Sequence, residues 1–394
     1  MSVVEVEDLT VEFPLPRGRL RAVDGISFAI EQGEAFGLVG ESGSGKSVTA
    51  LALLRLLEPA AEVTCRHLWF KGEDLPAKNA HEMRAIRGRH IGMVFQDPMT
   101  SLNPAFSVGE QIAEVYRYHL RLGRSEGAQR ALDALDRVRL PQAREMYHRY
   151  PHEFSGGMRQ RVMIAMAIAC EPDLLIADEP TTALDVTIQA QILALLDELR
   201  RERRMALLFI SHNLEVVAQT CDRVAVMYAG RLMEEAEPGA LFDAPAHPYT
   251  EGLLRSIPQR ERSLRAIPGA ICDLVAPPSG CRFHPRCGHA QEQCRTVEPA
   301  LLPMAGSPGR RTACHFPLGQ VEATPRLFLP FDSAQGKLSA QPERAGPGPG
   351  GQPEQTGPGP GGQPEQTGPG PRGQPEQTGP GPGDHPAHGE PVEP

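Results

Sequence analysis

Residues 40–47 read Gly40-Glu41-Ser42-Gly43-Ser44-Gly45-Lys46-Ser47, and this stretch decides the fold of the chain. It fits the pattern G-x-x-x-x-G-K-[ST], in which glycines let successive backbone N–H groups converge on phosphate oxygens. The apolar run Ala35–Val39 before it predicts a buried strand, and the Ala- and Leu-rich run Val48–Leu57 after it predicts a helix. The unit therefore predicts a loop that binds nucleotide phosphates at a helix N-terminus, with Lys46 at the β- and γ-phosphates and Ser47 on Mg²⁺.

A second stretch supplies two carboxylates. Leu174–Ala177 is wholly apolar and is followed by Asp178 and Glu179. A lone strand of this kind is more often ordinary core, but beside a phosphate-binding loop it predicts chemistry. We expect Asp178 to bind Mg²⁺ through water and Glu179 to face the attacking water as a general base.

Three further positions are candidates at strand ends. The run 90–95 ends in Gln96, which places an amide at an edge where sites on parallel sheets are built. The apolar run Ala206–Ile210 leads to His212, which could donate to the γ-phosphate or be a satisfied structural histidine. Phe13 ends an expected strand over 3–13, where it could stack on adenine, although sequence alone favours a core position.

Helical patterns separate these strands. Residues 107–140 space apolar side chains three and four apart and predict a helical insert. Ser155-Gly156-Gly157 then opens an apolar helix to Cys170, as a second candidate anion site or a simple helix cap. Another helix is expected over 186–203. Alternating strands and helices predict an α/β fold, a mainly parallel sheet covered by helices.

Composition limits the class of protein. The chain has 394 residues and 40 basic against 49 acidic side chains, a net charge of −9, so no basic excess points to nucleic acid. The N-terminus lacks a basic start followed by an apolar run, and the longest apolar run, Val162–Cys170, is far shorter than the roughly 20 residues that span a bilayer. We therefore expect a cytoplasmic protein whose membrane work needs a partner.

Four cysteines lie close together in a segment rich in Pro and Gly. Cys281, Cys287, Cys294 and Cys314 have the spacing C-x₅-C-x₆-C-x₁₉-C. In the cytoplasm a metal is a better explanation than disulfides. These spacings are longer than the knuckles of structural zinc sites, and they suit a [4Fe–4S] cluster at least as well. A mixed zinc site with nearby histidines (His284, His289, His315) and four unliganded thiols stay open.

The chain beyond residue 320 has another character. Gly346–Thr356, Gly357–Thr367 and Gly368–Thr378 repeat the eleven-residue unit G-P-G-P-[GR]-G-Q-P-E-Q-T. The period is not three, so it is not collagen-like, and the unit lacks apolar residues that could offset the entropy of ordering. We expect a disordered tail over 321–394.

Taken together, the motifs resemble the ATP-binding subunits of ABC transporters over about residues 3–235. The resemblance identifies residues 40–47 as Walker A, Asp178 and Glu179 as Walker B with its catalytic glutamate, and Gln96 and His212 as the Q-loop and switch histidine. It makes Ser155-Gly156-Gly157 the signature motif, Ala183-Leu184-Asp185 the D-loop, and Phe13 the aromatic position that stacks on adenine. It implies ATP and Mg²⁺ as ligands, with Ser47, Gln96 and Asp178 around the metal.

A narrower resemblance is to the oligopeptide/dipeptide importer subfamily. It rests on 94–104, on His247-Pro248-Tyr249-Thr250 and on Pro278–Cys287. The segment Ile271–Leu274 departs from the usual proline-containing run, which leaves Cys272 outside the pattern. This subfamily is associated with a [4Fe–4S] cluster on the four cysteines, and nickel and glutathione importers share the extension.

The resemblance also implies partners and domains. We expect a cassette over 1–245 with a helical insert at about 100–165, a C-terminal extension over 246–320 and the tail over 321–394. The expected partners are a second ATPase subunit, two transmembrane permeases and an extracytoplasmic substrate-binding protein, with no nucleic acid, at the cytoplasmic face of the inner membrane. A soluble ABC-type ATPase acting on DNA or ribosomes is the main rival, but such proteins usually carry two cassettes or a long coiled coil. A non-hydrolysing cassette would lack Glu179 or His212, and both are present.

Overall fold

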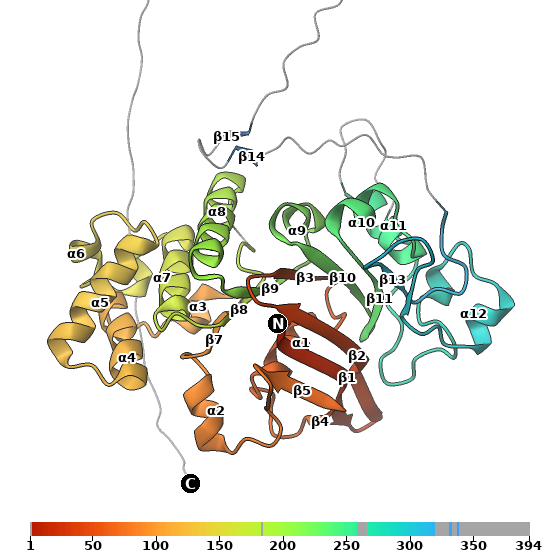
Figure 1. Ribbon diagram of the computed structural model, residues 1–394, viewed down its shortest axis with the longest axis horizontal. Helices are drawn as coiled ribbons and strands as arrows, with labels where there is room; N and C mark the ends of the chain where they lie inside the picture. The colour runs from red at the N-terminus through yellow and green to blue at the C-terminus, as the bar shows by residue number, and fades with distance from the viewer. Residues whose placement is uncertain (1, 183, 258–265, 320–330, 333–336, 339–394) are drawn as a thin grey trace, which may run out of the picture. The chain divides into compact units, whose positions relative to one another are not determined.

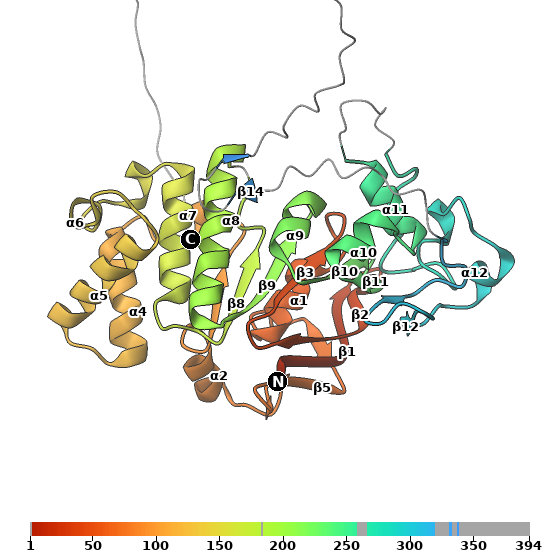
Figure 2. The same ribbon diagram turned by 45° about the horizontal axis from the view of Figure 1, so that its top comes forward.

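The computed structural model describes residues 2–182, 184–257 and 266–319, together with the short strands β14 (Phe331–Asp332) and β15 (Lys337–Leu338). Ala183 and the repeats at 346–378 lie outside the described residues, as does most of the expected tail. Within the described part, the expected α/β fold is present (Figures 1 and 2).

The centre of the molecule is an eight-stranded sheet in the order β12-β13-β11-β10-β3-β9-β8-β7. Strands β10, β3, β9, β8 and β7 are parallel, as predicted, whereas β11 and β13 run antiparallel to their neighbours. Parallel strands end at a common edge, so the residues that follow β3, β8 and β9 meet there. The strands are β3 (Ala35–Val39), β7 (Ile91–Val94), β8 (Leu174–Asp178), β9 (Ala206–Ser211), β10 (Arg223–Tyr228), β11 (Arg231–Ala236), β12 (Leu302–Pro303) and β13 (Arg311–Thr312).

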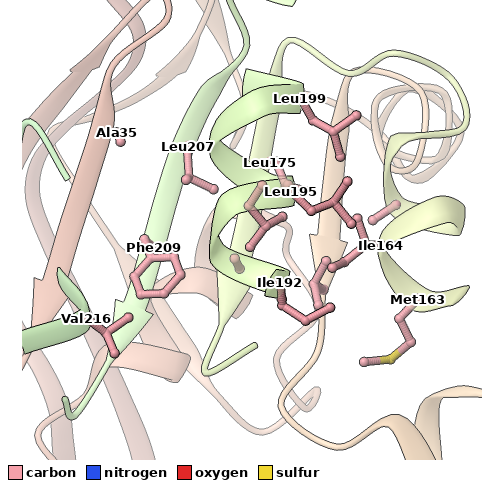
Figure 3. Close-up of a cluster of buried hydrophobic side chains, with 14 of the residues drawn as sticks. Ala35, Met163, Ile164, Leu175, Ile192, Leu195, Leu199, Leu207, Phe209 and Val216 are labelled. Carbon is pink, nitrogen blue, oxygen red and sulfur yellow. The ribbon is translucent and has the colours of Figure 1, made fainter. Parts of the chain in front are cut away.

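Both faces of this sheet are buried, which explains why its strands read as continuous apolar runs. In β8, Leu175 and Ala177 face one apolar core while Leu174 and Ile176 face the other. The first core is filled by helices α7, α8 and α9, and Figure 3 shows Leu195 of α8 and Ile164 of α7 beside strand residues of this face. The helices are α7 (Gly156–Ile168), α8 (Val186–Arg203) and α9 (Leu214–Thr220).

A second, antiparallel sheet and two helices cover the other face. Its order is β2-β1-β5-β6, with β4 also paired to β1. Strand β1 of the β1–β2 hairpin contains the strand expected at 3–13. The elements are β1 (Ser2–Leu15), β2 (Gly18–Glu31), β4 (Glu62–Thr64), β5 (His67–Phe70), β6 (Glu73–Asp74), α1 (Lys46–Leu53) and α2 (Ala80–Ile86).

Two expected helix ends are wrong, those of α1 and α7. Helix α1 ends before Leu57 because Arg55 adopts a left-handed φ of 50° and the Leu56 N–H bonds to the carbonyl of Leu51, a typical C-terminal cap. The helical insert expected over 107–140 is present, and it is divided into two helices where Arg121 has a left-handed φ of 56°. Helix α7 ends at Ile168, before Cys170. The helices of the insert are α3 (Pro98–Ser101), α4 (Val108–Leu120), α5 (Arg124–Arg137) and α6 (Ala143–Met146), with the 3₁₀ turn η1 (Pro151–Glu153).

The C-terminal extension is joined to the main sheet by strand pairing and by buried charges. Strand β13 adds to the edge of β11, so Glu235 pairs with Arg311. Glu234 is 0 % exposed, and its carboxylate accepts bonds from Arg310 (2.7 Å) and from the N–H groups of Ala246 and His247 (2.9 Å each). A buried carboxylate needs partners of this kind, so the extension is part of the folded core. Its elements are α10 (Pro238–Asp243), α11 (Pro248–Arg255), η2 (His284–Arg286) and α12 (Glu292–Thr296).

The insert and the extension lie at opposite ends of the main sheet. In both views α4, α5 and α6 stand beyond β8, and α12 stands beyond β11 (Figures 1 and 2). Among the described helices, none combines the length and the apolar content needed to cross a bilayer.

Candidate functional site

The loop at residues 40–45 links β3 to α1 and depends on its glycines. Gly40 and Gly45 have φ of 156° and 107°, and a Cβ on either would lie 2.0 Å and 2.4 Å from the carbonyl oxygens of Met227 and Ala22. No side chain fits at these contacts without moving backbone. Gly43 has φ of 77° in open space, so only its conformation requires glycine.

Lys46 begins α1 and is 5 % exposed. Its ammonium donates to the carbonyls of Gly40 and Glu41, both at 2.9 Å. Burial lowers the pKa of Lys46, while the carboxylates of Glu179, Asp178 and Glu41 oppose that shift. The cation is therefore held inside the loop at the position where phosphate oxygens are predicted to bind.

Two of the three residues predicted around Mg²⁺, Ser47 and Asp178, come from different elements and meet, whereas Gln96 bonds to Glu179. The Ser47 hydroxyl at the start of α1 donates to Asp178 Oδ1 at the end of β8, at 3.1 Å. Asp178 is 4 % exposed, and its burial raises the pKa of that carboxyl. Two oxygen donors side by side at a phosphate-binding loop suit Mg²⁺, which prefers oxygen ligands and is often shared with substrate phosphates.

Glu179 lies at the centre of a hydrogen-bonded group. Gln96 Nε2 and the Thr182 hydroxyl each donate to its Oε2 at 2.9 Å, and His212 Nδ1 lies 3.0 Å from its Oε1. Burial raises the pKa of Glu179, but the hydrogen bonds from His212 and Thr182 outweigh it and hold that pKa below its usual value. Glu179 also has a left-handed φ of 46°, fixed by its N–H bond to the carbonyl of Ile210. Such conformations cost about 1–3 kcal/mol and often occur at functional sites.

The sequence pointed to three members of this group, Gln96, Glu179 and His212, and the structure brings them together. The fourth, Thr182, was not predicted to take part. It lies three residues after Glu179, and its hydroxyl is the only local signal that could have pointed to it.

Phe13 is half-buried on β1 and pairs with Leu20 of β2. Ala22, two residues further along β2, is the residue whose carbonyl approaches Gly45. The hairpin that carries Phe13 therefore contacts the phosphate-binding loop. The stacking role of Phe13 on adenine stays a prediction.

The Ser-Gly-Gly motif caps α7 rather than joining the loop. The Ser155 hydroxyl accepts from the N–H of Met158 at 3.3 Å. A Cβ on Gly157 would lie 2.5 Å from Ile188 Cγ2 of α8, whereas one on Gly156 would make an ordinary 3.5 Å contact with Leu184. Gly157 is thus needed for the packing of α7 on α8. The predicted action of the motif on another subunit's ATP is not tested by one chain.

The four cysteines of the extension line one small pocket of ≈ 20 Å³. All four are free thiols, and burial raises the pKa of Cys281 and of Cys314 to about 11. His247 lines the same pocket, and among the described residues its buried Nε2 finds no hydrogen-bond partner. Within the described residues, no three His, Cys, Asp or Glu side chains are arranged to hold a single metal ion.

Comparison with protein families gives two matches along the chain. Residues 23–182 match the model described as ABC transporter, and residues 233–294 match the model described as oligopeptide/dipeptide transporter, C-terminal region. The first match contains the loop and the carboxylates, and the second contains three of the four cysteines.

Whole proteins are similar over most of this chain. The dipeptide transport ATP-binding protein DppD of Escherichia coli K12 is 48% identical over 321 residues, which are 81% of this chain and 98% of that protein. The oligopeptide transport ATP-binding protein OppD of Salmonella typhimurium LT2 is 48% identical over 81% of this chain and 95% of that protein. Among solved structures, the dimeric ATP-binding cassette MJ0796 bound to ADP and Pi has a TM-score of 0.54 and 26% identity, covering 60% of this chain and 98% of that one.

Proposed function

Because this chain belongs to the ABC transporter family, with the C-terminal region of its oligopeptide/dipeptide branch, we propose that it hydrolyses ATP to power the import of dipeptides or oligopeptides. One observation carries the chemical part of this proposal. Gln96, Thr182 and His212 converge on Glu179, at the same sheet edge where Ser47 meets Asp178.

Each group has a role that follows from its position. Lys46 and the loop N–H groups bind the β- and γ-phosphates, and Ser47, Asp178 and Gln96 hold Mg²⁺, which when bound offsets the charge of the phosphates. Glu179 accepts a proton from the attacking water, and His212 donates to the γ-phosphate. Phe13 stacks on the adenine ring. The depressed pKa of Glu179 keeps it ionised and able to accept that proton near neutral pH.

Two subunits complete each ATP site. Ser155 and Gly157 of one subunit contact the γ-phosphate that Lys46 of the other binds, with Gly156 between them at the start of α7. ATP binding then favours the closed pair and hydrolysis favours its reopening, a coupling through different affinities for the two states. The similarity to a dimeric cassette supports this arrangement.

The proposed partners are a second ATPase subunit, two permeases and an extracytoplasmic substrate-binding protein, with the chain bound at the cytoplasmic face of the inner membrane. The proposed domains are a cassette over 1–245, an extension over 246–320 and a tail over 321–394. The two similar proteins are both named as transport ATP-binding proteins, which supports the proposed role as a transporter subunit.

We further propose that Cys281, Cys287, Cys294 and Cys314 hold a [4Fe–4S] cluster. The support for this proposal is that all four thiols line one pocket of the extension. When bound, the cluster would cross-link four segments of the extension. The raised pKa of Cys281 and of Cys314 means that binding has to displace their protons.

The test of the function is transport. The chain is co-expressed with candidate permeases and a candidate binding protein and reconstituted in vesicles. Dipeptides, oligopeptides, nickel and glutathione are then compared as stimulators of ATP hydrolysis. Peptide-stimulated hydrolysis with peptide uptake is expected, and stimulation by nickel or glutathione alone would reassign the substrate. Co-purification with nucleic acid instead of permeases would contradict a transport role.

A further inference from the structure

Every polar group of Glu41, the second residue of the phosphate-binding loop, is held by a named partner. Its carbonyl accepts from Lys46 at 2.9 Å, and its N–H donates to the Tyr249 hydroxyl at 3.0 Å. Its carboxylate accepts two bonds from Arg286, at 2.7 Å and 3.0 Å. Two of these three partners, Tyr249 and Arg286, belong to the C-terminal extension, more than 200 residues away in sequence.

Burial, a hydrogen bond and two aromatic rings hold the Arg286 side chain in this orientation. Its side chain is 5 % exposed, and its Nε donates to the carbonyl of Pro268 at 2.9 Å. Its guanidinium carbon lies 5.6 Å from the ring centre of Tyr228 and 6.0 Å from that of Phe283. A paired bond of this geometry fixes direction as well as charge, and the bonds to Glu41 are the main reason that the pKa of Arg286 is raised.

Tyr249 makes the second contact from a rigid position. It is 0 % exposed, its ring centre lies 4.7 Å from that of Tyr228, and its own N–H donates to His247 Nδ1. Its hydroxyl accepts from the Glu41 N–H, so the start of the loop is anchored through backbone as well as side chain.

We propose that Arg286 and Tyr249 are positioning residues of the ATP site, through which the C-terminal extension sets the affinity of the phosphate-binding loop for nucleotide. The loop must present its N–H groups in one arrangement to bind phosphate, and preorganisation of that arrangement raises affinity. Arg286 also neutralises a carboxylate that would otherwise lie unpaired beside bound phosphates. Both effects act through Glu41.

The 3₁₀ turn η2 connects Arg286 to the four-cysteine pocket. Arg286 ends this 3₁₀ turn, Cys287 follows it directly, and the Cys287 N–H bonds to the carbonyl of His284. Arg286, which bonds to Glu41 of the loop, is therefore adjacent in sequence to Cys287, which lines the four-cysteine pocket.

The experiment measures binding of a fluorescent ATP analogue with Mg²⁺ to the full-length chain. Arg286→Gln is expected to weaken binding about tenfold, and Tyr249→Phe, which removes only the hydroxyl, about threefold. In a Glu41→Gln background, Arg286→Gln is expected to have less than about a twofold further effect, since the two residues act as one unit. In the assembled transporter, Arg286→Gln should raise the KM for ATP and leave kcat within about twofold.

Arg310→Gln is the matched control. Arg310 also joins the extension to the sheet, but its hydrogen bonds go to buried Glu234 and to the carbonyl of Ala244 rather than to the loop. It is expected to lower the melting temperature and leave nucleotide affinity unchanged. Equal weakening by Arg310→Gln would overturn the proposal, because the extension would then act only through general stability. So would an undiminished effect of Arg286→Gln in the Glu41→Gln background. If Arg286→Gln does not fold, Tyr249→Phe decides, and wild-type affinity in that variant would also overturn it.

Discussion

His212 Nδ1 and Glu179 Oε1 lie 3.0 Å apart, although β9 and β8 deliver them from different stretches of chain. The pairing follows from parallel neighbours in the sheet, since Asp178 is in register with Ile210. Glu179 follows Asp178 by one residue and His212 follows Ile210 by two, so the two side chains meet at the sheet edge. An imidazole beside a carboxylate fixes the orientation of both, as a base and its supporting group require.

We predict that Glu179→Gln abolishes ATP turnover and retains ATP binding. The amide keeps the shape of the carboxylate but cannot accept the proton of water, and loss of a general base costs about 10²–10⁴ in rate. Single-turnover hydrolysis and nucleotide binding are measured on the assembled transporter. Retention of most of the wild-type rate would remove Glu179 from its proposed role.

Lys46→Ala is predicted to change the affinity for ATP. Its ammonium is the buried cation of the loop, so its removal should weaken ATP binding by at least about tenfold. Equilibrium binding with and without Mg²⁺ checks this. Unchanged affinity with a lower kcat would mean that Lys46 acts in the transition state alone.

The two glycines of the Ser-Gly-Gly motif form a matched pair for stability. Gly157→Ala places a Cβ 2.5 Å from Ile188 and should destabilise the fold by about 1–3 kcal/mol. Gly156→Ala makes only a 3.5 Å contact with Leu184, so its urea unfolding midpoint should lie close to that of the wild type. Urea unfolding of the isolated chain compares them. Equal unfolding midpoints for the two variants would show that α7 shifts away from α8 at little cost.

Anaerobic purification is predicted to yield a brown protein with about four iron and four sulfide per chain. Cys287→Ser should bleach the colour, while Cys272→Ser, at a half-buried thiol outside the four-cysteine pocket, should retain it. Iron, sulfide and zinc analysis with an absorption spectrum are the measurements. Stoichiometric zinc without iron, or a folded protein free of metal, would contradict the cluster.

The predictable parts of the fold are the elements whose pattern of apolar residues lies within one continuous stretch of sequence. The runs Leu174–Asp178 and Val186–Arg203 carry their strand and helix within a single stretch, and the structure has β8 and α8 at those bounds. The group around Glu179 was largely predictable for the same reason, because each motif ends a strand of one parallel sheet.

What escaped prediction depends on partners distant in sequence. Strand β13 is only Arg311–Thr312, too short for any periodicity, and it forms because the edge of β11 offers it hydrogen bonds. The grip of Arg286 on Glu41 likewise joins residues 245 apart. The packing of the extension decides which residues form such an ion pair, and the presence of an Arg and a Glu in the sequence does not predict it.

The edge of β11 has a consequence for the order of synthesis. Arg311 pairs with Glu235 across a separation of 76 residues, so β11 leaves the ribosome well before the strand that covers it. At about 5–20 residues per second, the nascent chain exposes that edge for roughly 4–15 s. An open strand edge is a template for pairing with other chains. Translational pauses or stop codons before Arg311 should therefore favour aggregation of the nascent protein, even where the whole ATP site has already been made.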